Sequence, residues 1–162
     1  MQNTSAILWH AHHELAQTLL HTPFVQGIAD GSLPPVCFSC YVGQKAFYLE
    51  TFARAYSITA ARAPDWESFN LLHHLADEAI QERDRYNHYA SRWQVAGHPL
   101  VPEPPMQRFM DILLTTAWNH SVGQTAAAMV PWQRLYALYG ATLTQDGLPQ
   151  HTYTGWIRAC IA

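Results

Sequence analysis

The chain has 162 residues, of which 49% are apolar and only 13% charged, and its formal net charge is −3 with ten histidines counted as neutral. This length and composition fit one domain with a single hydrophobic core, so we expect one domain over residues 1–162. The few lysines and arginines are scattered, which excludes nucleic acid as a partner, and no run approaches the roughly 20 apolar residues that span a membrane.

Helical periodicity dominates the chain, and no run alternates for long enough to predict a strand. A turn rich in proline and glycine is expected between the first two helices, Asp65 is expected to cap the third, and Pro131 should kink the fifth. Another helix should begin near Tyr153. Long helices with mostly short connections predict an all-α, up-and-down helical bundle. The five predicted helices before Tyr153 cover residues 4–20, 35–62, 65–95, 105–119 and 123–143.

The second predicted helix has an apolar face that a single lysine, Lys45, interrupts. A buried ammonium group must be paired, hydrogen-bonded or neutralised, so an inward lysine among tyrosines predicts a cavity with polar contents. We expect Glu78 or Glu82 of the third helix as its partner. The alternative is a long side chain whose ammonium reaches water. The face, at three-and-four spacing, consists of Phe38, Tyr41, Val42, Lys45, Tyr48, Leu49, Phe52 and Tyr56.

Two other patterns could hold a metal ion. Cys37 and Cys40 form a CxxC pair, but zinc takes four ligands and Cys160 is the only other thiol, so we expect buried, inert cysteines. Histidines and acids four residues apart on the third helix are explained by ordinary pairing on a helix surface. We therefore predict no metal and no cofactor.

The cellular setting and the assembly state can also be predicted. The N-terminal segment has no basic region ahead of an apolar run, and three cysteines do not suit a disulfide framework, so we expect a cytoplasmic protein. The low charge leaves little solvating surface for a monomer, because globular proteins average about 25% charged residues. Self-association is the expected result.

Several segments together resemble the TenA/thiaminase II family. The first pair is PFVQGIADGSLP over residues 23–34 followed by YVGQKAFYL over residues 41–49, which is similar to the family's tyrosine-glutamine-aspartate-tyrosine helix. Similar segments follow at 108–117 (RFMDILLTTA), 126–140 (AAAMVPWQRLYALYG) and 153–162 (YTGWIRACIA), so the resemblance spans essentially the whole chain. It implies a haem-oxygenase-like all-α fold and a homotetramer.

The resemblance also implies a function, the hydrolysis of thiamin or its aminopyrimidine breakdown products in thiamin salvage. In such proteins an acid on the Tyr-x-x-Gln helix holds the pyrimidine and a cysteine after Leu-Pro attacks its ring. Gln44, Tyr48 and Tyr136 match the family's pattern. The resemblance thus places a small-molecule pocket at Gln44, Lys45, Tyr48, Phe109, Trp132 and Tyr136, to which Glu78 is added as a partner for Lys45.

Three of these positions depart from the family. Lys45 takes the place of the aspartate, Trp132 that of the nucleophilic cysteine, and Phe109 that of a tyrosine. We therefore expect impaired hydrolysis. The alternative is a non-hydrolytic protein that binds a pyrimidine-like or anionic ligand or merely assembles, with a relative of di-metal oxidases as a weaker option. The family continues through two more helices beyond Ala162, so we expect either a truncated reading frame or a neighbouring subunit that covers the exposed core.

Overall fold

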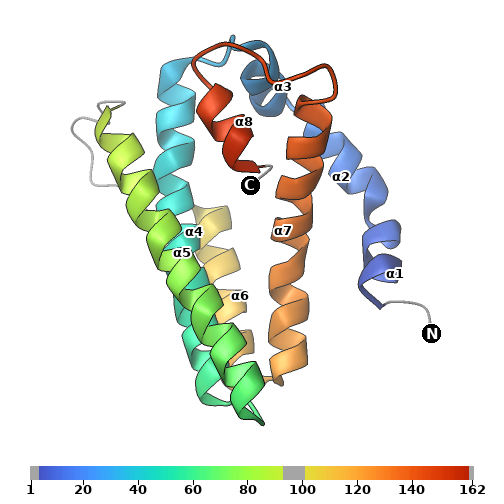
Figure 1. Ribbon diagram of the computed structural model, residues 1–162, viewed down its shortest axis with the longest axis vertical. Helices are drawn as coiled ribbons and strands as arrows, with labels where there is room; N and C mark the ends of the chain where they lie inside the picture. The colour runs from blue at the N-terminus through green and yellow to red at the C-terminus, as the bar shows by residue number, and fades with distance from the viewer. Residues whose placement is uncertain (1–3, 93–100, 161–162) are drawn as a thin grey trace. The chain divides into compact units, whose positions relative to one another are not determined.

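A computed structural model describes residues 4–92 and 101–160, and all the regular structure in these ranges is helical (Figure 1). The residues form two compact units. The first unit comprises Met1–Pro34 and Val130–Ala162, and the second comprises Pro35–Met129. No helix in the described ranges is long and apolar enough to cross a membrane. The helices are α1 (Thr4–Ala11), α2 (His13–Leu20), α3 (Pro23–Asp30), α4 (Pro35–Ala61), α5 (Trp66–Arg92), α6 (Pro104–Asn119), α7 (Val122–Leu143) and α8 (Thr154–Cys160).

The long helices agree with the sequence prediction, whereas the segment that precedes α4 does not. The predicted helix over residues 4–20 is interrupted at His12, whose backbone has φ −114° and ψ 13° and whose N–H bonds to the carbonyl of Trp9. The predicted turn over residues 21–34 contains a helix, α3. The end of the predicted helix 65–95 falls partly outside the described residues, since α5 is described as far as Arg92.

Local sequence explains why α3 forms. Thr22 is extended at φ −67° and ψ 146°, and its hydroxyl accepts the N–H of Val25. Pro23 opens the helix at a position where its missing N–H costs nothing. Gly31 ends the helix in the left-handed region, with φ 81°. A cap, an opening proline and a closing glycine therefore define this short helix.

The second unit is built around α4. The connection from Ala61 to Trp66 is short, so α4 and α5 lie antiparallel and side by side (Figure 1), and α6 also packs against α4. Asp65 caps α5 as predicted, because its carboxylate accepts both the N–H and the hydroxyl of Ser68, at 2.7 and 3.0 Å. The predicted inward face of α4 is buried along its length apart from Tyr41, which is half-buried.

The first unit joins α3 to the turn that precedes α8. The ring Nε2 of His151 donates to the carbonyl of Ala29 at 3.1 Å, because Nδ1 accepts the N–H of Tyr153 at 3.1 Å. The Tyr153 hydroxyl donates to the carbonyl of Leu33. These bonds tie residues 29–33 to residues 151–153, which are far apart in the sequence.

Helix α7 contributes residues to both units, and the division falls between Met129 and Val130. Pro131 lies inside this helix, next to the division, as the sequence predicted. The helix continues through it to Leu143, and the kink expected at Pro131 stays a prediction.

Candidate functional site

Lys45 is the centre of the candidate site in the second unit. Its side chain is only 5% exposed, and its Nζ lies 3.5 Å from Oε1 of Glu82, a carboxylate on α5 that is 37% exposed. The predicted inward direction of Lys45 is therefore confirmed, and one of its two expected partners is present. The ammonium group is paired, as a buried charge must be.

Two tyrosine rings also face this ammonium group. Nζ lies 4.5 Å from the centre of the Tyr48 ring and 5.6 Å from that of Tyr86. Both distances are within the range in which a cation is attracted to an aromatic face. Tyr48 lies one helical turn after Lys45 on α4, and Tyr86 lies one turn after Glu82 on α5. The site thus combines one cation, one carboxylate and two aromatic faces from two antiparallel helices.

Tyr48 belongs to a group of stacked rings that reaches α6. Its ring centre lies 4.3 Å from that of Phe52 and 6.1 Å from that of Phe109. Burial raises the pKa of the Tyr48 hydroxyl, and the carboxylate of Glu82 raises it further. Tyr48 is therefore held neutral well into the alkaline range. Phe109, predicted as a site residue, does contact the Tyr48 ring, and it adds no polar group.

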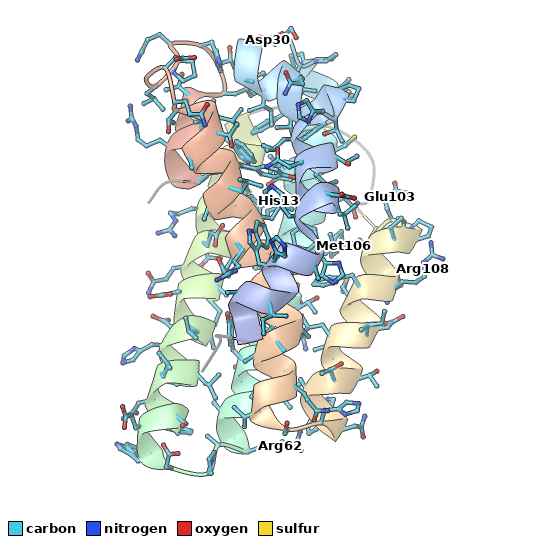
Figure 2. All side chains as sticks on the ribbon, turned by 90° about the vertical axis from the view of Figure 1, so that its right-hand side faces the viewer. His13, Asp30, Arg62, Glu103, Met106 and Arg108 are labelled. Carbon is cyan, nitrogen blue, oxygen red and sulfur yellow. The ribbon has the colours of Figure 1, made fainter. Side chains whose placement is uncertain are left out.

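Gln44 bonds to the chain ahead of α6. Its amide nitrogen donates to the carbonyl of Val101 at 3.0 Å, and its amide oxygen accepts the N–H of Glu103 at 2.9 Å. Glu103 stands at the start of α6, with Met106 and Arg108 following on the helix (Figure 2). Both ends of the amide are thus used by the backbone, so Gln44 positions α6, and with it Phe109.

The positions of Glu78 and of two cysteines differ from those that the sequence predicted. Glu78 is exposed on α5, one turn before Glu82, and Glu82 is the carboxylate that meets Lys45. Cys37 and Cys40 are exposed, so the prediction that they are buried is wrong, because both lie off the buried face of α4. The prediction that they are inert stays a prediction. Within the described ranges, no group of three or more histidine, cysteine, aspartate or glutamate side chains is placed to hold a metal ion.

Trp132 and Tyr136 belong to the first unit, on α7. Both are half-buried. Tyr136 lies 6.1 Å from Tyr139 and 6.1 Å from Trp156 between ring centres, so it forms part of an aromatic cluster between α7 and α8. Burial raises the pKa of Tyr139 to about 12. The assignment of Trp132 and Tyr136 to a ligand pocket stays a prediction.

Tyr86 is the site residue that sequence reasoning missed. Glu78, Glu82 and Tyr86 follow one another at intervals of four, so they share one face of α5. Because Glu82 is one of the two expected partners of Lys45, this spacing indicates Tyr86 as well. The choice between Glu78 and Glu82 depends on the register of α5 against α4, which the sequence does not display.

The fold is the haem-oxygenase-like all-α fold, and two solved structures share it. One is a TenA homologue from P. horikoshii OT3, with a TM-score of 0.81 and 21% identity, which matches 98% of this chain and 76% of its own. The other is a TenA family transcription regulator from Silicibacter sp., with a TM-score of 0.86 and 19% identity, over 99% of this chain and 73% of its own. A sequence model of the TENA/THI-4/PQQC family matches residues 9–161, and the chain belongs to this family.

Relatives whose names state a function match this chain over a smaller share of their own length than the two solved structures do. The chain is 29% identical over 151 residues to the thiamine biosynthesis multifunctional protein ThiED of Corynebacterium efficiens, covering 93% of this chain and 20% of that protein. It is 27% identical over 139 residues to the aminopyrimidine aminohydrolase of Bacillus subtilis, covering 83% and 59%. The chain therefore spans a fifth of the first relative and less than two thirds of the second.

Proposed function

We propose that this protein acts in thiamin pyrimidine salvage by binding an aminopyrimidine, and that it does not hydrolyse the compound it binds. Membership of the TENA/THI-4/PQQC family supports the salvage role. So do relatives described as aminopyrimidine aminohydrolases in Bacillus subtilis and Halalkalibacterium halodurans.

The observation that carries the proposal is the pair formed by Lys45 and Glu82, 3.5 Å apart. An aminopyrimidine has an amino group that donates hydrogen bonds next to a ring nitrogen that accepts one. The ammonium of Lys45 is a donor and the carboxylate of Glu82 an acceptor, so the pair complements that edge. Tyr48 adds an aromatic face next to the pair. Glu82 thereby supplies the acid that the family's aspartate position lacks here.

The same pair makes an anionic ligand the weaker alternative. A negatively charged ligand would suit the Lys45 ammonium if that group had no carboxylate partner. Glu82 provides that partner and would repel an approaching anion, because like charges at short range are unfavourable. The pyrimidine-like ligand is therefore favoured over the anionic one.

Trp132 is the reason that we expect no hydrolysis. The resemblance to the family places its nucleophilic cysteine at this position. A thiolate can attack an electron-poor ring and leave again, whereas an indole side chain offers no comparable nucleophile. Because tryptophan is also much larger than cysteine, Trp132 would occupy space that the family's chemistry needs.

Calorimetric titration with an aminopyrimidine tests the binding mode. We expect Lys45→Met and Glu82→Gln each to weaken binding about tenfold to a hundredfold, since a hydrogen bond to a charged group contributes roughly 1.5–3 kcal/mol. Glu78→Gln is the matched control, because Glu78 is exposed one turn earlier on the same helix. The affinity of this variant for the aminopyrimidine should equal that of the unmodified chain. Equal effects of Glu78→Gln and Glu82→Gln would refute the assignment, and tighter binding of a carboxylate-bearing pyrimidine would favour the anionic alternative.

Ammonia release from an aminopyrimidine and cleavage of thiamin test the second half of the proposal. We expect neither reaction to exceed the rate without protein. Hydrolysis that disappears in Lys45→Ala would show that another nucleophile operates, and the interpretation of Trp132 would be wrong.

A second candidate function is assembly without a ligand. It is favoured by large apolar side chains that lie exposed on the described surface, among them Trp66 at 72% and Trp118 at 64%. Such side chains mark a contact with another protein where they form a contiguous patch. A protein that binds neither pyrimidines nor anions and forms a stable oligomer would support this candidate.

A further inference from the structure

Cys37 and Cys40 are both free and exposed, close to the beginning of α4. Cysteine is among the residues most often buried, so two exposed thiols in one short segment are unusual. The residues between them, Phe38 and Ser39, are buried. The two cysteines therefore lie together on the outward side of the helix, three positions apart.

This spacing brings the two thiols close without joining them. Side chains three positions apart on a helix have Cβ atoms about 5–6 Å from each other, whereas a disulfide needs about 3.5–4.5 Å. Closure therefore requires the two Cβ atoms to approach by roughly 0.5–2.5 Å, the difference between these ranges, through a local change of the backbone. A disulfide formed under such strain is more easily reduced than a relaxed one.

The position of Cys37 lowers the free-energy cost of that backbone change. It is the third residue of α4, which begins at Pro35. The first four residues of a helix donate no hydrogen bond within it, and Pro35 has no N–H to donate at all. Cys37 can thus shift toward Cys40 without breaking a helical hydrogen bond donated by its own N–H.

We propose that Cys37 and Cys40 form a surface dithiol that low-molecular-weight disulfides, such as oxidised glutathione, convert reversibly to an intramolecular disulfide. One thiolate attacks a sulfur of the oxidant, which forms a mixed disulfide and releases one reduced thiol. The second cysteine then attacks the protein sulfur of the mixed disulfide and releases a second reduced thiol. The two cysteines are oxidised, the oxidant is reduced to two thiols, and the two protons of the cysteines pass to those thiols. This chemistry is independent of the proposed pyrimidine binding.

Thiol counting by mass spectrometry tests the proposal on the whole chain. The reduced protein is incubated with oxidised glutathione, quenched in acid and labelled with a maleimide. Of the chain's three cysteines, we expect two to become unreactive without carrying glutathione, and dithiothreitol should restore both. Peptide mapping should place the bond between Cys37 and Cys40, and amide exchange over residues 35–42 should become faster because the first turn of α4 is distorted.

Serine variants supply the controls. The Cys37→Ser variant should retain one glutathione on Cys40, and the Cys40→Ser variant should retain one on Cys37. In each variant the second thiol, which would displace the glutathione, is missing. Cys160→Ser removes the half-buried cysteine and should leave the loss of two thiols unchanged. Two stable glutathione adducts on the unmodified chain, disulfide-linked copies on a non-reducing gel, or no reaction at either thiol would each overturn the proposal.

Discussion

Removing one partner of the Lys45–Glu82 pair should destabilise the protein far more than removing the other. Lys45 is 5% exposed and Glu82 is 37% exposed, so the two charges differ in their access to water. Glu82→Gln leaves a buried ammonium without its carboxylate. Lys45→Met removes the buried charge and keeps an apolar stem of similar length. The carboxylate that remains can then be hydrated at the surface.

The magnitudes follow from these exposures. Breaking a fully buried pair costs about 3–5 kcal/mol and an exposed pair about 0–1 kcal/mol, so Glu82→Gln, with one partner half-exposed, should cost about 2–3 kcal/mol. Lys45→Met should cost about 0–1 kcal/mol, because the loss of the pair and of the Tyr48 ring contact is offset by the lower desolvation penalty. The double variant should resemble Lys45→Met, since the buried ammonium is then absent.

Urea unfolding of the four proteins measures this cycle, because urea is uncharged and does not screen the pair as guanidinium chloride would. Glu78→Gln, at an exposed position, serves as the control and should lie within about 0.5 kcal/mol of the unmodified chain. A larger loss in Lys45→Met than in Glu82→Gln, or two losses that simply add in the double variant, would refute the reasoning that Lys45 is the buried member of the pair.

Three further outcomes are expected. Because burial raises the pKa of Tyr48, the folded chain keeps a proton that an unfolded tyrosine loses above pH 10.0, so the free energy of unfolding should fall as pH rises past that value. Tyr48→Phe should flatten this loss in urea titrations between about pH 9 and 11. Gly31→Ala should lower the free energy of unfolding more than Gly147→Ala, since both have positive φ but only a Cβ at Gly31 would lie 3.0 Å from the His151 ring; equal losses would remove the contact as a cause. Sedimentation should show self-association at micromolar concentration, and a well-folded monomer would contradict the expected oligomer.

The sequence predicted the long helices and the direction of Lys45, because both follow from helical periodicity. It also predicted the cap at Asp65, where a local hydrogen bond decides the outcome. Helix α3 was missed although Thr22, Pro23 and Gly31 form a recognisable start and stop. Such a short helix has little stability of its own and depends on burying residues such as Ile28.

Other differences have causes that the sequence shows only in part. The break between α1 and α2 at His12 contains no proline or glycine, so the local sequence does not predict it. The face that Cys37 and Cys40 occupy on α4 indicates exposure, whereas the general tendency of cysteine to be buried indicates the opposite. Within the site, Glu82 rather than Glu78 meets Lys45 because of how α5 packs on α4, which is a tertiary contact that no local pattern encodes.

Gln44 and Lys45 are neighbours in sequence, yet they influence the stacked rings of Tyr48 and Phe109 through different contacts. Lys45 touches the Tyr48 ring directly, whereas Gln44 fixes the backbone at Val101 and Glu103, from which α6 carries Phe109 to that ring. The amide suits this role because its nitrogen donates and its oxygen accepts. A glutamate at position 44 would lose the bond to Val101, and the change would reach Tyr48 through a helix that begins two elements further along the chain.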